Sequence, residues 1–203
     1  MTLFLDIETL PAPPKLEPLL RKIYEAKSRQ TSSFERFLHG TSLSGNYGQI
    51  LCIGYAQHEG AATLISGSEP EILRTFWKLV SADTLFVGHN AFDFDLPFIL
   101  KRSVIHEIKP TVDIQFHRGT NQPIYDTMRE WDSWGTKSTS LDHLAKILGI
   151  PTPKSSINGS QVWDYHRAGR DQEIFEYCLR DVVAVRSIYY RLTFQQSSAN
   201  KTK

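Results

Sequence analysis

The sequence has 203 residues, of which 40% are hydrophobic and 22% are charged, as in ordinary globular domains and unlike disordered chains. Its 23 basic and 22 acidic side chains give a net charge of +1, without the basic excess typical of proteins that coat nucleic acid. That balance excludes no local basic surface. Two cysteines exclude a disulfide scaffold, and no apolar run reaches the roughly 20 residues of a membrane span. With Asp6 where a signal peptide is apolar or basic, we expect a cytoplasmic protein.

The first third of the chain predicts strands interrupted by a helical insert. Residues 3–6 form an apolar run that ends in an acid, which indicates a buried strand. Three prolines then stop regular structure, and the apolar spacing within 15–27 predicts an amphipathic helix. Residues 28–48 are polar and indicate a loop or a short helix. Strands follow at 49–57 and 61–65, joined by a short turn.

The middle of the chain alternates between helical and strand patterns. Ser68 and Glu71 match a capping box, followed by apolar residues at helical spacing. Residues 84–87 predict a strand, 96–103 a helix and 108–114 a further strand.

The remainder predicts helices. Ser140 begins one that Gly149 and Pro151 end, and 171–192 form a long one. The fold class is therefore α/β, a mixed five-stranded sheet flanked by helices. We expect one domain at 1–194, with an insert at about 12–42 and a polar tail at 195–203.

Acidic side chains gather at three places in this scheme, the first at the end of the first strand. Asp6 and Glu8 are two residues apart, so in a strand their carboxylates point to one face. Two neighbouring carboxylates resist burial as ions unless a cation lies between them, and oxygen ligands suit Mg²⁺ or Mn²⁺. The alternative is a strand that simply enters solvent.

The second place is the segment 88–98, where a strand ends and a helix begins with Pro97 in its first turn. Asp93 and Asp95 are both candidates for a metal-site acid, although an acid here also makes a good helix cap. The third place holds Tyr177 and Asp181, one helical turn apart, where the hydroxyl could orient a water beside a metal-binding carboxylate. The alternative is a helix that packs the tyrosine and exposes the acid.

Taken together, these motifs resemble the tyrosine-bearing branch of the DEDD superfamily of 3′–5′ exonucleases, which has an RNase H-like, DnaQ-like fold. The segment FDLPFI at 94–99, preceded by Asn90, is similar to the second exonuclease motif of family B DNA polymerases and their stand-alone relatives. Three further segments resemble the stand-alone enzymes: 45–56, 139–151 and 157–166. The resemblance covers most of the chain, apart from about 12–42 and 115–137.

The resemblance implies a metal-dependent exonuclease that removes nucleoside 5′-monophosphates from a free 3′ end of single-stranded DNA or RNA. It implies two ions, Mg²⁺ or Mn²⁺, and it favours Asp95 over Asp93 by the spacing from Asn90. Asp6 would bridge both ions, Asp95 would act through bound water, and Tyr177 would orient the attacking water. The catalytic set is then Asp6, Glu8, Asp95, Tyr177 and Asp181, and the four acids are also the metal ligands.

Substrate contacts are expected from residues beside this set: Leu10, Pro11, His89, Asn90 and Phe98. Aromatic side chains can stack on bases and cationic ones can bind phosphates, so further candidates are Trp131, Trp134, Lys101, Arg102, Lys137 and Lys154. For Phe98 the alternative is packing in the core, and for the cations it is an exposed surface.

Two other hypotheses remain open: a nucleic-acid-binding module on an exonuclease fold that has lost catalysis, and a nuclease that cuts internally. No motif reports a contact to a 2′-hydroxyl, so the sequence does not choose between DNA and RNA. It also leaves the oligomeric state and the role of the insert open.

Overall fold

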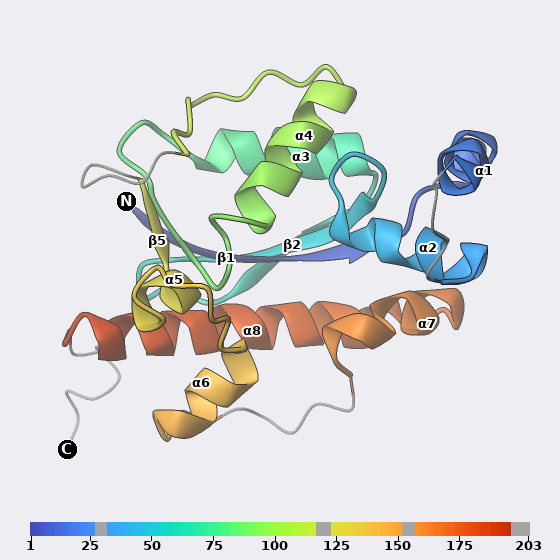
Figure 1. Ribbon diagram of the computed structural model, residues 1–203. Coiled ribbons are helices and arrows are strands. Elements are labelled where there is room, and N and C mark those ends of the chain that lie inside the picture. Colours follow the sequence, from blue (N-terminus) through green and yellow to red (C-terminus); the bar gives the residue numbers. More distant parts are fainter. Residues whose placement is uncertain (27–31, 117–122, 152–156, 196–203) are drawn as a thin grey trace.

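A mixed five-stranded sheet forms the centre of the computed structural model, which describes residues 1–26, 32–116, 123–151 and 157–195 (Figure 1). The strand order is β3-β2-β1-β4-β5, in which β1 runs antiparallel to β2 and parallel to β4. The strands are β1 (Thr2–Leu10), β2 (Gln49–Gln57), β3 (Thr63–Ser66), β4 (Leu85–Gly88) and β5 (Ile124–Asp126). This sheet confirms the predicted fold class.

Helices cover both faces of the sheet because β1 is apolar on both sides. Leu3, Leu5 and Ile7 pack into the core under α3 (Glu69–Leu79) and α4 (Asp95–Ile105). Phe4 points to the other face and packs against α8 (Asp171–Leu192); Figure 1 shows this helix running along that side of the sheet. The other helices are α1 (Glu17–Glu25), α2 (Phe34–Gly40), α5 (Thr127–Trp131), α6 (Leu141–Ile147) and α7 (Val162–Arg167), with short 3₁₀ turns at Pro14–Leu16, Thr41–Leu43 and Gly159–Gln161. Within the described ranges, no helix combines the length and apolar character needed to cross a bilayer.

Two helix starts confirm the capping signals in the sequence. Ser68 and Glu71 form the predicted capping box at the start of α3, with the Ser68 hydroxyl 2.6 Å from Glu71 Oε2. Ser140 caps α6, where its side chain accepts a hydrogen bond from the His143 amide. In both cases a side-chain oxygen satisfies an amide that the first helical turn leaves without a partner.

The prediction of a strand at 108–114 is wrong, and the fifth strand is the shorter β5. Pro110 has no amide hydrogen to give to a ladder, and the Thr111 hydroxyl donates instead to the Trp77 carbonyl at 2.6 Å. Ile108 and Ile114 still pack on the core beside α3. The alternating apolar pattern therefore reflects an irregular segment that lies over the core rather than a strand.

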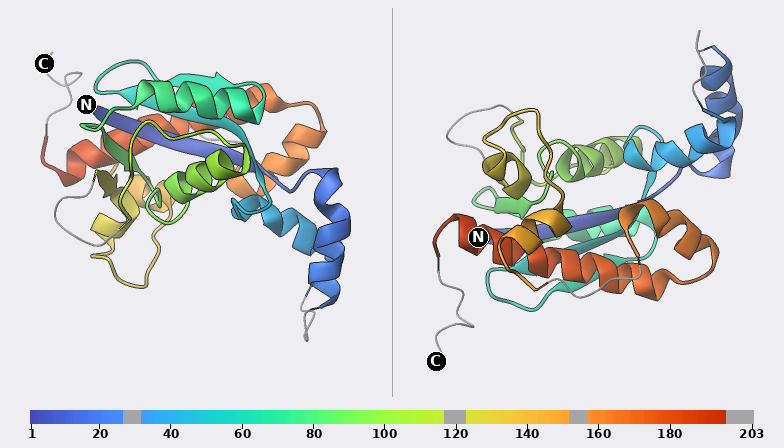
Figure 2. Two further views of the ribbon diagram at one scale, coloured as in Figure 1. Left: turned by 90° about the horizontal axis from the view of Figure 1, so that it is seen from above. Right: turned by 60° about the horizontal axis from the view of Figure 1, so that its bottom comes forward.

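The insert at about 12–42 contains two helices where the sequence predicted one helix and then a loop or short helix. Both lie at the carboxyl end of β1, and Figure 2 shows α1 extending away from the body of the molecule. Tyr24 of α1 packs against Phe34 and Phe37 of α2, with ring centroids 5.5 Å apart in each pair. The Ala12 amide donates to the Thr41 hydroxyl at 2.8 Å, which ties the two ends of the insert together.

Candidate metal-dependent active site

The first two acids lie on the face of β1 that is covered by α8. Asp6 and Glu8 follow Phe4 at a spacing of two, and Glu8 is only 6% exposed. Gly54 of β2 lies opposite Asp6, and a Cβ atom there would stand 2.8 Å from the Cys178 sulfur. Glycine at this position therefore allows α8 to approach the sheet closely enough to enclose both carboxyl groups.

Asp95 reaches the same strand from its open edge. The ladder between β1 and β4 ends at Phe4, so the Ile7 amide has no strand partner on that side. The Asp95 side chain, at the start of α4 and 4% exposed, accepts that amide hydrogen at 3.1 Å. Asp95 thus takes the place of the missing strand and brings its carboxyl group to the middle of β1.

Asp93 points elsewhere, although it is only two residues away. It is exposed and forms an ion pair with Arg129, whose Nε donates to Asp93 Oδ2 at 2.7 Å. The structure brings Asp95 beside the acids of β1 and keeps Asp93 near solvent. The catalytic assignment of Asp95 itself stays a prediction.

Tyr177 and Asp181 complete the group from α8, one helical turn apart. The Tyr177 hydroxyl donates a hydrogen bond to Asp181, and that bond lowers the pKa of the acid while raising that of the phenol. Burial is the main cause that raises the Tyr177 pKa above its ordinary value, and the charges of Asp181 and Glu8 add to it. The phenol therefore keeps its proton throughout the neutral range.

Electrostatics show that the four carboxyl groups form one cluster. Burial raises the pKa of Asp6 well above its ordinary value, and the charges of Glu8, Asp181 and Asp95 raise it further. Burial similarly raises the pKa of Glu8, that of Asp95 to about 7 and that of Asp181 to about 6. The charges of Asp181 and Asp95 also raise the pKa of Glu8, whereas Asp126 raises that of Asp95 and Asp142 raises that of Asp181.

The residues fit a divalent cation. Asp6 Oδ2 is shielded from solvent and, within the described parts of the chain, is the buried side-chain oxygen that has no hydrogen-bond partner. Ligand atoms of Asp6, Glu8 and Cys178 all lie within 4.8 Å of one another. Buried carboxylates require a partner, and Mg²⁺ or Mn²⁺ would supply both the missing coordination and the missing charge.

Asp126 supports the site and was missed by the sequence analysis. It is fully buried at the end of β5 and accepts hydrogen bonds from the amides of Asn90 and Phe92, at 3.0 and 2.9 Å. The same carboxylate caps α5. It therefore fixes the turn that leads into Asp95. The cap before α5 was the available signal, but its long-range partners follow only from the fold.

The polar residues that end β4 are engaged within the protein. His89 Nδ1 lies 2.9 Å from the Thr127 hydroxyl and its Nε2 lies 2.8 Å from the Thr139 carbonyl. Burial lowers the pKa of His89, and both ring nitrogens have partners within the protein, so the predicted contact with a sugar or phosphate has no free nitrogen. Asn90 takes a left-handed backbone conformation (φ +68°) in the turn before α4, and its contact with substrate stays a prediction.

The predicted apolar contacts lie in different surroundings. Leu10 and Pro11 are buried at the end of β1, next to the pocket described below. Phe98 is 2% exposed and packs in the core against Phe94, so its ring has no free face for a base. Trp131 is 38% exposed, whereas the Trp134 ring packs edge-on against Phe92 and its indole donates to Glu130.

The candidate phosphate-binding side chains differ in their exposure to solvent. Lys101 and Lys137 are exposed, and Lys154 lies outside the described residues. For Arg102 the structure corrects the prediction of a phosphate contact. The residue is buried, and its Nε and Nη2 donate to the two carboxylate oxygens of Glu69 at 2.9 and 2.8 Å. This ion pair links α4 to α3, so Arg102 is not available to a phosphate.

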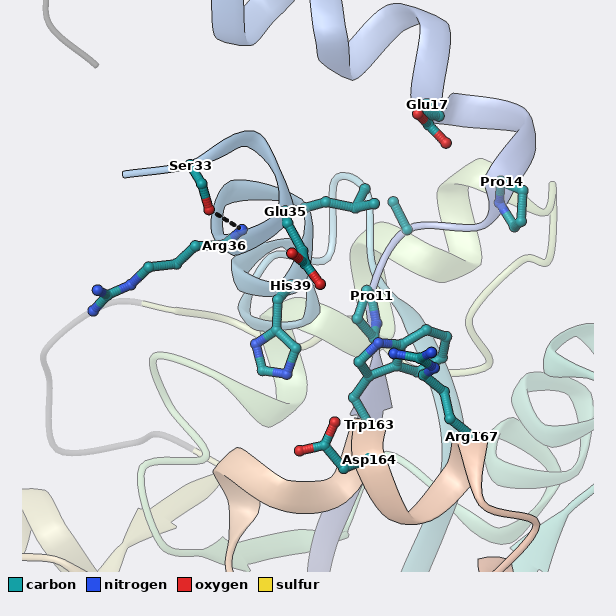
Figure 3. A pocket seen from close by; sticks show the side chains of 12 residues that line it. Pro11, Pro14, Glu17, Ser33, Glu35, Arg36, His39, Trp163, Asp164 and Arg167 are labelled. Atoms are coloured by element: carbon teal, nitrogen blue, oxygen red, sulfur yellow. Dashed lines mark hydrogen bonds between the residues drawn. The ribbon is translucent and has the colours of Figure 1, made fainter. Parts of the chain in front are cut away.

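A pocket of about 460 Å³ lies where β1 ends, between α2 and α7 (Figure 3). In Figure 3 the His39 ring and the Asp164 carboxylate face one another across the gap, while Arg36 extends away from the other lining side chains. Trp163 belongs both to this pocket and to the apolar cluster that contains Leu10 and Tyr177. Trp163 therefore connects the pocket to the apolar cluster on which Tyr177 packs.

Comparisons with known proteins show which proteins this chain resembles. The chain is 27% identical over 161 residues to an uncharacterized protein of Methanocaldococcus jannaschii, covering 73% of this chain and 88% of that protein. It is 24% identical over 149 residues to a DNA polymerase of Archaeoglobus fulgidus, covering 66% of this chain and 19% of the polymerase. The solved family B DNA polymerase of Pyrobaculum calidifontis superposes on 95% of this chain with a TM-score of 0.65 and 16% identity, over 24% of its own chain.

This chain thus spans about a fifth to a quarter of the polymerases that it matches. A family model described as a predicted 3′–5′ exonuclease related to the exonuclease domain of PolB matches residues 56–203. The match includes Asp95, Tyr177 and Asp181, whereas Asp6 and Glu8 lie before it. The chain therefore belongs to the family of predicted 3′–5′ exonucleases related to the exonuclease domain of PolB.

Proposed function

We propose that this protein hydrolyses the terminal phosphodiester bond at a free 3′ end of single-stranded DNA or RNA and releases nucleoside 5′-monophosphates. The observation that carries the proposal is the buried Asp6 Oδ2, which has no hydrogen-bond partner among the described residues and lies in a cluster of four carboxyl groups. Such a cluster is costly to keep charged without cations. Together with membership of an exonuclease family, it supports metal-dependent hydrolysis of a phosphate ester.

Two divalent ions, Mg²⁺ or Mn²⁺, would supply the charge that activates water and stabilises the leaving 3′ oxygen. Asp6, Glu8, Asp95 and Asp181 would hold them, and Tyr177 would lie beside Asp181. The protein contributes the arrangement of these oxygens in a site shielded by α8. The Ile7 amide keeps the Asp95 carboxylate turned toward β1.

Tyr177 acts as a positioning group for the attacking water. Its hydroxyl donates to Asp181, so the oxygen lone pairs stay free to accept a hydrogen bond from that water. Because burial and neighbouring acids hold the phenol in its protonated form, it is unsuited to act as a general base. Activation of that water would then be supplied by the bound cations, and Tyr177 would only orient it.

The pocket between α2 and α7 suits the nucleotide that precedes the terminal one. Its volume of about 460 Å³ is in the range of small-ligand sites, and it adjoins Leu10 at the end of β1. Trp163 offers an aromatic surface for a base. Its ring also stacks on the ring of His166, with the two ring centroids 5.8 Å apart. Arg167 lines the same pocket and can neutralise a phosphate.

The central experiment digests matched DNA and RNA oligonucleotides labelled at the 5′ end. Each is prepared with a free or a blocked 3′ end and incubated with Mg²⁺, Mn²⁺ or EDTA. We expect ladders that shorten from a free 3′ end, release of nucleoside 5′-monophosphates, and no products with EDTA. Comparing the digestion rates of the DNA and RNA oligonucleotides shows which of the two the protein prefers.

Other outcomes of that experiment would contradict the proposal. Products from blocked ends would indicate a nuclease that cuts internally. Binding without products at every ion concentration would indicate the alternative, a nucleic-acid-binding module on an exonuclease fold.

The proposed nucleotide pocket has its own test in Trp163→Ala. We expect KM for an oligonucleotide to rise about tenfold because a stacked base contributes roughly 1–3 kcal/mol. Hydrolysis of the p-nitrophenyl ester of thymidine 5′-monophosphate, which carries no further nucleotide, should be unchanged. Trp134→Ala is the matched control because its ring packs on Phe92, away from the pocket. An equal rise in KM for both variants would exclude a specific role of Trp163.

A further inference from the structure

We propose that the Cys178 thiol is a ligand at the acid cluster, so that the site binds thiophilic divalent cations such as Cd²⁺ and Zn²⁺ through Asp6, Glu8 and Cys178. The inference rests on the proposed function only in using the same acid cluster. It differs from the oxygen-only site expected for Mg²⁺ or Mn²⁺, because it adds a sulfur ligand that the sequence analysis did not assign.

The position of the sulfur carries the inference. Cys178 is fully buried on the face of α8 toward the sheet, with its sulfur 3.6 Å from the Asp6 carbonyl oxygen. Its ligand atom and those of Asp6 and Glu8 all lie within 4.8 Å of one another. Ligands of one tetrahedral zinc ion stand about 3.6 Å apart when the bonds are about 2.1 and 2.3 Å. Small side-chain rotations would therefore close the three groups around one cation.

Two further features support a ligand at this place. Asp6 Oδ2 is buried and accepts no hydrogen bond from the described residues, so this carboxylate oxygen is available to a cation. Gly54 has no side chain, and a Cβ atom there would come within 2.8 Å of the Cys178 sulfur. The sulfur is therefore held against the sheet beside the acids, where a larger residue at position 54 would push α8 outward.

The chemistry of the ligand set determines which ions gain from it. Mg²⁺ prefers oxygen ligands and gains nothing from sulfur, whereas Cd²⁺ and Zn²⁺ bind thiolate strongly. On binding, the sulfur–metal bond forms and the thiol proton leaves to the buffer, so uptake of one ion releases one proton from Cys178. A thiophilic ion should thus displace Mg²⁺ or Mn²⁺ from the acids and inhibit hydrolysis.

Cadmium provides a direct test because a cadmium–thiolate bond absorbs ultraviolet light. The full chain, kept reduced with a phosphine that binds metal weakly, is titrated with Cd²⁺ while absorbance and heat are recorded. We expect a charge-transfer band that saturates at one ion for each chain. Cys178→Ser should lose the band and bind Cd²⁺ at least about tenfold more weakly, with Mn²⁺ affinity changed far less.

Cys52→Ser is the control because Cys52 is the other buried thiol, opposite Glu8 on β2; it forms a hydrogen bond with Cys178 but lies outside the three-ligand group. It should keep the band. Asp6→Asn gives a second variant that leaves both thiols in place and should weaken Cd²⁺ binding and the band together. Circular dichroism identifies any variant that fails to fold, and Asp6→Asn then tests the site without altering a thiol.

The inference is overturned if folded wild-type protein binds Cd²⁺ without the band, or if the band disappears in Cys52→Ser and persists in Cys178→Ser. It is also overturned if Asp6→Asn leaves the band and affinity unchanged. None of these measurements uses nucleic acid. A protein that shows the band but digests no oligonucleotide would therefore contradict the proposed exonuclease activity and leave the metal site standing.

Discussion

Two clusters of buried charge lie on the two faces of the sheet, and they are built in opposite ways. Between α3 and α4, the Glu69 carboxylate pairs with the side chains of Arg102 and His106. Its Oε1 also accepts a hydrogen bond from the Ile50 amide at 2.8 Å. Between β1 and α8, Asp6 and Glu8 face two further acids, and Asp6 Oδ2 has no partner among the described residues.

The pKa values of the two clusters move in opposite directions for this reason. Burial opposes ionisation of Glu69, but hydrogen bonds from Arg102, Ile50 and His106 outweigh burial and lower the pKa. Burial and like charges both raise the pKa values of the acid cluster. The first cluster is complete within the chain and serves the fold. The second holds like charges and an oxygen without a partner among the described residues, which makes it the candidate functional site.

The largest expected effect comes from Asp6→Asn. Removing this carboxylate should lower the rate of 3′-end hydrolysis by about 10³-fold or more, because both ions would lose a shared ligand. The same change should leave the metal-free protein as stable as the wild type or more stable, since it removes repulsion. Oligonucleotide digestion and thermal unfolding without metal measure the two effects. Asp6→Asn protein that unfolds more easily would contradict the contrast between the clusters.

Glu69→Gln should show the reverse pattern. It leaves the Arg102 charge buried without its partner, so we expect a loss of about 3 kcal/mol in the free energy of unfolding. The exposed pair of Asp142 and Lys146 gives the control, because Asp142→Asn should cost less than about 0.5 kcal/mol. Urea denaturation measures both. Equal losses would mean that burial of the Glu69 pair adds nothing.

The pH dependence of stability should separate the clusters in the metal-free protein. The pKa of Asp95 is raised to about 7 and that of Asp181 to about 6, so their stabilising protonated forms are present at low pH and lost as pH rises through those values. Stability should fall between about pH 4, the ordinary aspartate value, and about pH 7, and Mn²⁺ should restore it more at pH 8 than at pH 5.

Glu69 acts with the opposite sign. Its folded pKa is lowered, so its contribution is present above the ordinary glutamate pKa and is lost as pH falls through the folded value. Thermal melts across pH with and without Mn²⁺ measure both trends. A stability curve that does not change with Mn²⁺ at pH 8 would contradict cation binding by the acids.

Tyr177→Phe should have a smaller effect on hydrolysis than Asp6→Asn. The variant keeps the four acids and loses one hydrogen-bonding group, so we expect kcat to fall about 10- to 100-fold with KM little changed. The measurement uses saturating Mn²⁺, where metal affinity no longer limits the rate. A loss as large as that of Asp6→Asn would show that the phenol does more than position water.

The smallest effect is expected from Asp93→Asn. Asp93 lies near solvent in an ion pair with Arg129, so hydrolysis should change by less than about twofold. Asp95→Asn, two residues away, should reduce activity about as much as Asp6→Asn. Digestion of one oligonucleotide by the two variants makes the comparison. Loss of activity in Asp93→Asn with full activity in Asp95→Asn would reverse the assignment of the third acid.

The fold was predictable where local patterns agree with tertiary packing. The capping boxes, the apolar faces of α3 and α8, and strands β1 and β2 all follow from periodicity and cap residues. The segment 108–114 shows the limit, since its alternation comes from packing on a core while Pro110 prevents a ladder. The three-residue β5 was too short to give a pattern of its own.

The sequence by itself determined the inventory and the order of the acids: Asp6 and Glu8 on a strand, an acid at a helix start, and Tyr177 with Asp181 on a helix. Only the tertiary structure decided what each side chain meets. The β1–β4 ladder ends early, which leaves the Ile7 amide to bind the Asp95 carboxylate. Arg102 forms an ion pair with the buried Glu69 carboxylate, and Gly54 allows Cys178 to lie against the acids. The reason is physical: spacing along the chain fixes which face a residue occupies, whereas burial, charge balance and ligand distance depend on segments that meet only in the fold.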